Sequence, residues 1–222
     1  MRPRSTRRHG LPSTVLSLAL SLVLMLGAAA VRAQADPADA LFTAIARDDA
    51  STLSTLFLRG ADPNQRDAKG QTALTLAIRA GHERAAGQLL GHPDIRVDLA
   101  NAHGETPLMM AALRGQLAWM RQLIDRGAAV QREGWSPLHY AASGPSVEAV
   151  RLLLERGAVV DARSPNGSTA LMLAARYGDE AAVRLLLARG ADAQARNELG
   201  LDAAEFARLG GREALAQALR PR

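Results

Sequence analysis

Apolar and polar positions alternate in short, regular blocks along residues 38–220. A typical block is an apolar run at helical spacing that ends at a glycine, the residue that most easily takes the left-handed conformation that closes a helix. A polar, extended turn follows and leads to a Thr or Ser that can cap the next helix. Pro107 and Pro137 directly follow such residues, where proline is tolerated at a helix start. The pattern therefore predicts many short helices connected by turns.

The blocks are copies of one another. Five heptads align, and their register residues step by 34, 30, 33 and 33 positions: Thr72, Thr106, Ser136, Thr169 and Asp202. Several units end in an L-L-x-x-G-A-like segment, with its glycine at Gly60, Gly127, Gly157 and Gly190. A T-P-L-H-x-A-like heptad that recurs about every 33 residues is the signature of ankyrin repeats. The chain resembles that family over residues 38–220.

The resemblance implies an all-α solenoid of about six helix-turn-helix units joined by short β-hairpin-like finger turns. We expect one ankyrin-repeat domain over 38–220, with units at about 38–66, 67–100, 101–132, 133–163, 164–196 and 197–222. The first unit lacks the T-P-L-H start, as expected for a terminal repeat with one face in water. The last unit ends in a predicted capping helix with a polar outer side.

One finger is shorter than the others. Gly60 and Thr72 are 12 residues apart, whereas Gly127 and Ser136 are only 9 apart. The three missing residues fall in the turn that normally projects as a finger, and Trp135 lies at its base. Two interpretations stay open. The change is a tolerated deletion, because exposed loop tips accept such changes, or it is a notch in the binding face that admits part of a partner.

Composition and charge narrow the function. The chain has no cysteine and therefore no disulfide, and its abundance of Ala and Leu with 3% aromatics suits stacked short helices. The formal net charge is +5, but five of the 27 basic residues lie within the first 33 positions, which contain no acidic residue. The remainder has 22 basic and 22 acidic residues. A neutral body gives no case for nucleic-acid binding.

Residues 1–33 have the layout of a secretory signal peptide, with a basic start, an apolar stretch and small residues at its end. We expect cleavage after Ala33, with Ala35 as a second position. The alternative is an uncleaved membrane anchor, although the apolar stretch Val15–Val31 is short for a span of about 20 residues. Much Ala, Arg and Leu with a single lysine suggests a GC-rich bacterial genome. We therefore expect a periplasmic or secreted bacterial protein that touches a membrane only if this segment is retained.

Catalytic patterns are missing from the sequence. It contains no G-x-S-x-G, no P-loop and no cysteine nucleophile. His139 occupies the histidine of the T-P-L-H motif, where the resemblance implies a structural hydrogen-bonding role, whereas Met109 replaces that histidine one unit earlier and loses those bonds. A metal site or an enzyme using His92, Asp94 and His103 is the remaining chemical alternative, but a second ligand pair at zinc-like spacing is absent. We expect no enzyme activity and no cofactor.

In the ankyrin family the partner usually meets the concave face, formed by the finger tips and the exposed ends of the first helices. Carried over by register, the candidate partner-binding residues are Arg66, Lys69, Arg79, Arg114, Trp135, Arg163, Arg176, Tyr177 and Arg196. Tyr, Trp and Arg are frequent at binding hot spots, and a strip of positive charge would select an acidic protein. The alternative is that Arg is simply the default polar residue of this genome and is solvated.

These observations predict a monomeric, non-catalytic scaffold that binds another protein through its concave face in the bacterial envelope. Two other roles fit the same sequence. The protein is an immunity protein or inhibitor of a periplasmic effector, or it is an accessory factor that stabilises an envelope enzyme, for example one handling oxidative stress. Fold alone does not decide among them.

Overall fold

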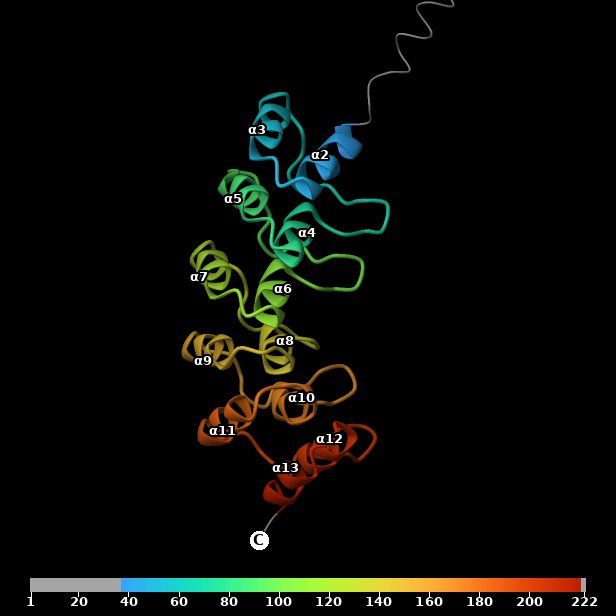
Figure 1. Cartoon of the computed structure of the whole chain (residues 1–222), viewed down its shortest axis with the longest axis vertical. Coiled ribbons are helices and arrows are strands. Elements are labelled where there is room, and N and C mark those ends of the chain that lie inside the picture. Colours follow the sequence, from blue (N-terminus) through green and yellow to red (C-terminus); the bar gives the residue numbers. More distant parts are fainter. Residues whose placement is uncertain (1–36, 221–222) are drawn as a thin grey trace, which may run out of the picture.

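The computed structural model describes residues 37–220, and the predicted signal segment lies outside the described residues. The described part forms six antiparallel helix pairs stacked along one axis (Figure 1). The inner helices are α2 (Pro37–Ala46), α4 (Ala73–Ala80), α6 (Pro107–Leu113), α8 (Pro137–Ser143), α10 (Ala170–Tyr177) and α12 (Ala203–Leu209). The outer helices are α3 (Ala50–Leu58), α5 (Glu83–Gly91), α7 (Leu117–Asp125), α9 (Val147–Glu155), α11 (Glu180–Ala188) and α13 (Glu213–Ala218). The predicted all-α solenoid of six units is confirmed.

The register residues cap the inner helices as predicted. The side-chain oxygens of Thr72, Thr106, Thr169 and Asp202 each accept a hydrogen bond from the backbone N–H three residues later. Such a cap satisfies one of the N–H groups that a helix start leaves without a partner. The inner helices α4, α6, α10 and α12 therefore begin directly after a residue that the repeat pattern marks and that caps them; Ser136 holds the same position before α8 but makes no side-chain cap bond.

The inner helices pack closely because one position in each heptad is alanine. These alanines are fully buried: Ala77, Ala111, Ala141, Ala174 and Ala207. Fully buried leucines such as Leu108, Leu138 and Leu171 fill the space between neighbouring units. A core of small residues at the contacts and leucine elsewhere is what a stack of short helices needs, since each unit buries its apolar surface only against its neighbours.

The fingers project from one side of the stack, to the right in Figure 1. Four of them close with the same backbone hydrogen bond, between residues 67 and 71, 101 and 105, 164 and 168, and 197 and 201, at 2.9–3.0 Å. A glycine with positive φ completes each turn, as at Gly104 (φ 77°). Among the described residues, the short finger between α7 and α8 has no equivalent of this bond, in keeping with its three missing residues. The fingers and the exposed ends of the inner helices form a surface that we call the inner face.

The third unit differs from its neighbours in its bulky side chains, and one expectation for it needs correction. Met120 is fully buried, whereas Trp119 is half-buried, with its ring over the surface of α5 beside Gly87. Met109 does not lose every bond of the motif histidine. Its sulfur accepts the backbone N–H of Thr106 at 3.4 Å, so a thioether, a weak acceptor, replaces one imidazole bond.

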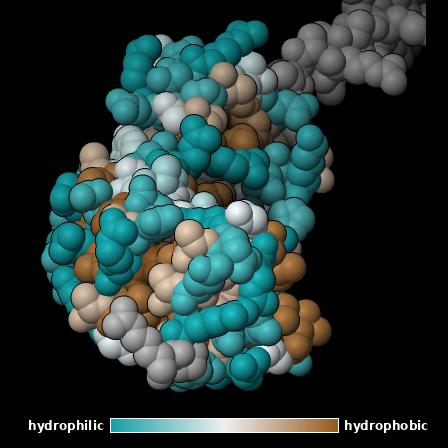
Figure 2. Space-filling view, turned by 60° about the horizontal axis from the view of Figure 1, so that its bottom comes forward, coloured by the Kyte–Doolittle hydropathy of each residue, from teal (hydrophilic) through white to brown (hydrophobic). Residues whose placement is uncertain are grey.

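The C-terminal end of the stack is covered mainly by hydrophilic residues with separate hydrophobic patches between them (Figure 2). Glu213 and Gln217 of α13 are exposed, and Ala216 and Leu219 face the core. This arrangement fits the predicted capping helix, because a terminal repeat needs a polar outer face. Within residues 37–220, no helix combines the length and the apolar character that crossing a membrane requires.

Candidate functional site

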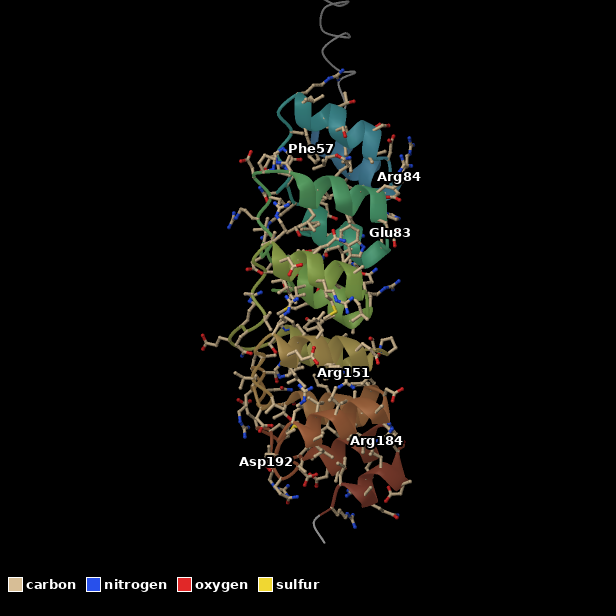
Figure 3. The ribbon with its side chains drawn as sticks, turned by 90° about the vertical axis from the view of Figure 1, so that its left-hand side faces the viewer. Phe57, Glu83, Arg84, Arg151, Arg184 and Asp192 are labelled. Carbon is tan, nitrogen blue, oxygen red and sulfur yellow. The ribbon has the colours of Figure 1, made fainter. Side chains whose placement is uncertain are left out.

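The ends of the inner helices α4 to α12 place one pair of residues from each of these five units at the same level of the inner face. These pairs are Arg79–Ala80, Leu113–Arg114, Ser143–Gly144, Arg176–Tyr177 and Leu209–Gly210. Arg79, Arg114 and Tyr177 are exposed there, and Arg176 is half-buried. The outer helices instead present mixed charge to solvent, with Glu83, Arg84, Arg151 and Arg184 on their surface (Figure 3). The inner face is therefore where basic and aromatic side chains coincide.

Three of the predicted partner-binding arginines hold the fingers together. Arg66 donates to the carbonyl oxygen of Gly70 in its own finger at 3.0 Å and to that of Ala100 in the next unit at 2.6 Å. Arg163 repeats this contact with the carbonyls of Gly167 at 3.2 Å and Arg196 at 2.8 Å. A guanidinium presents five N–H donors in a rigid fork, which lets one side chain bridge two backbone segments.

Arg196 occupies the same register at the last finger. It donates to the Gly200 carbonyl and makes ion pairs with Asp202 at 3.3 Å and Glu205 at 3.5 Å. Its charge is therefore compensated within the capping unit. The structure gives Arg66, Arg163 and Arg196 a role in the shape of the inner face, which sequence reasoning missed because each of them bonds backbone carbonyls of the fingers.

The other predicted cations are free to meet a partner. Within the described residues, the side chains of Lys69, Arg79 and Arg114 make no hydrogen bond or ion pair, and all three are exposed. Arg176 likewise has no acidic partner, but its guanidinium lies 4.8 Å from the centre of the Tyr177 ring. Of the predicted cations, those available to a partner are thus one lysine at a finger tip and three arginines at helix ends.

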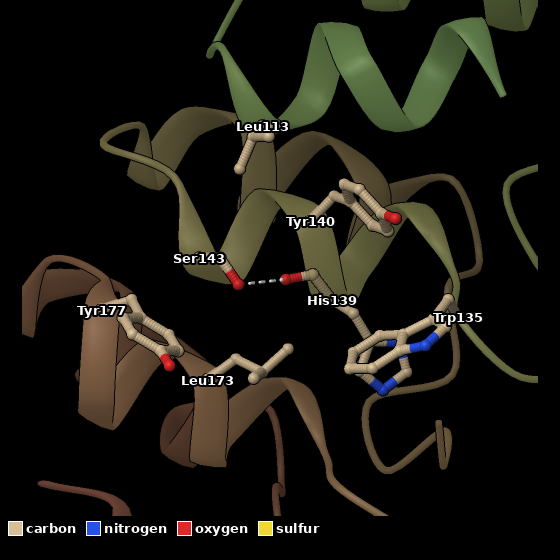
Figure 4. A pocket seen from close by; sticks show the side chains of 7 residues that line it. All are labelled: Leu113, Trp135, His139, Tyr140, Ser143, Leu173 and Tyr177. Carbon is tan, nitrogen blue, oxygen red and sulfur yellow. Dashed lines mark hydrogen bonds between the residues drawn. The ribbon is translucent and has the colours of Figure 1, made fainter. Parts of the chain in front are cut away.

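A hollow of about 260 Å³ opens in the middle of the inner face. Its walls come from α6, α8 and α10 and from the short finger (Figure 4), and its lining residues are Leu113, Trp135, His139, Tyr140, Ser143, Leu173 and Tyr177. We call this hollow the central pocket. The structure thus brings Trp135 and Tyr177 together on one site, with Arg114 and Arg176 each next in sequence to a lining residue.

The central pocket exists because the fourth unit is reduced at both of its ends. At one end the finger is three residues short, which uncovers Trp135. At the other end the unit carries Ser143 and Gly144, where its neighbours carry Leu113–Arg114 and Arg176–Tyr177. A Cβ on Gly144 would lie 2.5 Å from the carbonyl oxygen of Leu113, so α8 approaches α6 too closely for a side chain there. The fourth unit, with small side chains at its helix end, therefore lies between two units with large side chains there.

The polar groups of the pocket floor already have partners. His139 is buried, and burial lowers its pKa. The Tyr140 hydroxyl donates to Oε1 of Glu105 at 3.3 Å, and burial together with that negative charge raises the pKa of Tyr140 to about 12. The Ser143 hydroxyl donates to the carbonyl oxygen of His139 at 3.0 Å. The floor therefore offers hydrocarbon and aromatic surface.

The remaining chemical alternative is not assembled in the described residues. No group of three or more His, Asp or Glu side chains within residues 37–220 could hold a metal ion, so His92, Asp94 and His103 do not come together as ligands. The ring of His92 packs edge-on against Phe57, with centroids 4.9 Å apart, and its Nδ1 accepts the backbone N–H of Asp94 at 3.2 Å. These contacts give His92 a local structural role.

Comparison with known proteins agrees with the repeat pattern. The family model described as ankyrin repeats (3 copies) matches residues 41–133 and 127–197. The human ankyrin repeat and SOCS box protein 18 is 39% identical over 147 residues, which cover 63% of this chain and 31% of that protein. The ankyrin repeat and SAM domain-containing protein 6 of Rattus norvegicus is 37% identical over 121 residues, covering 53% and 14%.

A Danio rerio protein whose name describes a palmitoyltransferase, ZDHHC13, is 35% identical over 141 residues, covering 60% of this chain and 21% of that protein. The chain thus spans less than a third of the length of each of these relatives, and the likeness concerns a part of each. The family model accounts for most of the described residues in this chain. By its repeats, its helix pairs and these matches, the chain belongs to the ankyrin-repeat family.

Proposed function

We propose that this protein is a monomeric, non-catalytic scaffold that binds another protein through its inner face in the bacterial envelope. The observation that carries the proposal is the central pocket, which Trp135 and Tyr177 both line on a surface with uncompensated arginines. Aromatic residues and arginine at the centre of a surface are the usual anchors of a protein interface. The surface is held in shape by stacked units and by bridged fingers, so little conformational entropy is lost on docking.

The free cations favour an acidic partner. Arg79, Arg114 and Arg176 lie at helix ends along the inner face and have no acidic partner among the described residues. A single sign of charge speeds the encounter with a partner of opposite sign and excludes others. The envelope location rests on the signal-like sequence of residues 1–33 alone, and the two roles that fit such a location are inhibition of an effector and support of an envelope enzyme.

The test is affinity capture from an envelope extract of the source bacterium, with the purified protein as bait and mass spectrometry as readout. A triple variant, Arg79→Glu, Arg114→Glu and Arg176→Glu, removes the free arginines of the inner face. Its matched control is Arg84→Glu, Arg121→Glu and Arg151→Glu on the outer helices, where the side chains are exposed and make no ion pair among the described residues.

We expect an acidic protein that binds the wild type and the control but not the inner-face variant. The identity of that protein then separates inhibition of an effector from support of an enzyme. The scaffold proposal would be ruled out if every captured protein bound all three baits equally. It would also be ruled out if no captured protein depended on the inner face. Cell fractionation and the intact mass of the exported protein test the envelope location and the cleavage site separately.

A further inference from the structure

The hydrogen bonds of the polar groups in the central pocket indicate which kind of group can bind there. Its floor is saturated, because the hydroxyl groups of Tyr140 and Ser143 and both ring nitrogens of His139 have hydrogen-bond partners inside the protein. A polar group that entered would lose its water and find no new partner, which is costly. The floor therefore selects an apolar group.

The rim of the pocket offers donors and positive charge. Within the described residues, the indole N–H of Trp135 and the hydroxyl of Tyr177 have no hydrogen-bond partner, and 38% and 58% of these residues are exposed. Arg114 and Arg176 extend the same rim, since each adjoins a lining residue. The carboxylate that contacts the pocket lining, Glu105, is engaged by Asn101 and Tyr140, and Glu133 is exposed on the short finger. Around an apolar floor, the rim favours carbonyl and carboxylate oxygens.

The size of the pocket limits the occupant. At about 260 Å³ it lies below the range of roughly 300–1,000 Å³ that is usual for sites of small-molecule ligands and cofactors. The two walls are alike in character, because each has one leucine and one tyrosine: Leu113 and Tyr140 on one side, Leu173 and Tyr177 on the other (Figure 4). Such a cavity suits one bulky side chain.

We infer that the central pocket receives one leucine- or phenylalanine-sized side chain from a segment of the partner, and that Asp or Glu residues flanking this anchor pair with Arg114 and Arg176. The inference rests on the proposed function and adds the chemistry of the recognised segment. An apolar anchor in a pocket with charged groups at its rim is the usual arrangement of a hot spot. Selectivity comes from the acidic flanks, because a basic flank would meet the two arginines.

The test uses a phage-displayed library of random 12-residue peptides selected on the purified full chain. Synthetic, fluorescein-labelled copies of the enriched sequences then give dissociation constants by fluorescence polarisation. Ser143→Leu fills the pocket, and the change is compatible with the fold because Leu113 and Leu209 stand at the same register in other units. Thr55→Leu on α3 is its matched control, since the hydroxyl groups of Ser143 and Thr55 both bond the carbonyl four residues earlier.

A charge pair of variants completes the set: Arg114→Glu with Arg176→Glu, against Arg121→Glu with Arg151→Glu. We expect enriched peptides with one bulky apolar residue beside Asp or Glu. Their affinity should fall about tenfold or more with Ser143→Leu and with the inner-face charge variant, as for loss of a hot spot, and stay within about twofold in both controls. Circular dichroism of each variant shows that it is folded.

The inference is overturned if no peptide is enriched, if the enriched peptides lack an apolar anchor or carry basic flanks, or if Ser143→Leu binds them as the wild type does. Its failure is distinct from failure of the proposed function. A captured partner that is lost with the triple arginine variant but retained by Ser143→Leu would leave the scaffold proposal standing and remove the pocket. A captured partner that is indifferent to every inner-face change would remove both.

Discussion

The imidazole Nε2 of His139 lies 3.1 Å from the carbonyl oxygen of Ser168 in the next unit. A carbonyl only accepts hydrogen bonds, so Nε2 carries the proton and Nδ1 is the acceptor in the neutral ring. Nδ1 accepts the backbone N–H of Ser136 at 3.2 Å and lies 2.8 Å from its hydroxyl. One buried side chain thus fixes the start of its own helix and ties it to the following finger, as the motif position predicts.

This geometry makes stability depend on pH. Burial lowers the pKa of His139 from its ordinary value of 6.5. Between the lowered and the ordinary pKa, the unfolded chain binds more protons than the folded one, so the free energy of unfolding falls as the pH falls through 6.5 and below. We expect the urea midpoint of the wild type to drop between about pH 7.5 and about pH 5.5, on either side of the ordinary histidine pKa.

The control for this prediction is His139→Met. Methionine stands at the same register in the third and fifth units, where Met109 and Met172 each accept the N-cap N–H through sulfur. The variant should therefore fold, and its urea midpoint should change less over the same pH interval. An equal pH dependence in both proteins would show that another group is responsible.

The arginine bridges between fingers contribute to stability. Arg163→Ala removes the hydrogen bonds to the carbonyls of Gly167 and Arg196. Hydrogen bonds to a charged donor contribute about 1.5–3 kcal/mol when buried, and exposure of this site reduces the expected loss to about 1 kcal/mol. Urea denaturation should show this loss, whereas the control Arg151→Ala should stay within about 0.5 kcal/mol. Equal free energies of unfolding for the two variants would show that the bridges do not contribute to stability.

Two glycines with ordinary backbone angles should respond to alanine in opposite ways. A Cβ on Gly178 would lie 2.2 Å from the carbonyl oxygen of Ala142, so Gly178→Ala pushes α8 and α10 apart and should cost about 1–3 kcal/mol. A Cβ on Gly87, within α5, would meet nothing nearer than the Trp119 ring at 3.9 Å. Gly87→Ala should therefore stabilise by up to about 1 kcal/mol through helix propensity. Thermal unfolding of both variants tests this, and a stable Gly178→Ala would contradict the close packing.

How far the sequence reached depends on the range of each interaction. The cap bonds of Thr72, Thr106 and Thr169 join residues only three positions apart and recur in successive units. The fold could therefore be predicted from the spacing of the repeats alone. The bridge from Arg66 to Ala100 joins residues 34 positions apart, and a carbonyl acceptor leaves no mark in the side-chain sequence. The basic strip therefore contained structural residues that composition could not separate from Arg79, Arg114 and Arg176.

The central pocket lay between these two cases. The short finger with Trp135 at its base is visible as a gap in the spacing of the repeats, and the notch interpretation points to this place. The depth of the pocket also depends on Ser143 and Gly144 at the other end of α8, because the neighbouring units carry larger residues at the same register. Recognising this requires a comparison of Ser143 and Gly144 with the helix ends about 30 residues before and after them. Only the packed structure shows that these helix ends and the short finger border one hollow.

Asp48 ties the first unit to the second. It is the one non-glycine residue with positive φ among the described residues (φ 52°), a conformation that Asp and Asn tolerate best. Its Oδ1 accepts the backbone N–H of Ala85 at 2.7 Å, near the start of α5, whose own N-cap residue His82 makes no side-chain cap bond. A side chain from one unit thus caps a helix of the next.

Asp48→Ala should therefore lower the free energy of unfolding for two reasons. It removes a cap worth about 1 kcal/mol and places alanine in the left-handed region at a cost of about 1–2 kcal/mol. Asp48→Asn keeps both an accepting oxygen and the tolerance for this backbone, so it should stay close to the wild type. Urea denaturation gives the free energies, and hydrogen exchange at the Ala85 amide shows whether the loss is local to the first two units. Equal stability of the alanine and asparagine variants would mean that α5 is held by packing alone.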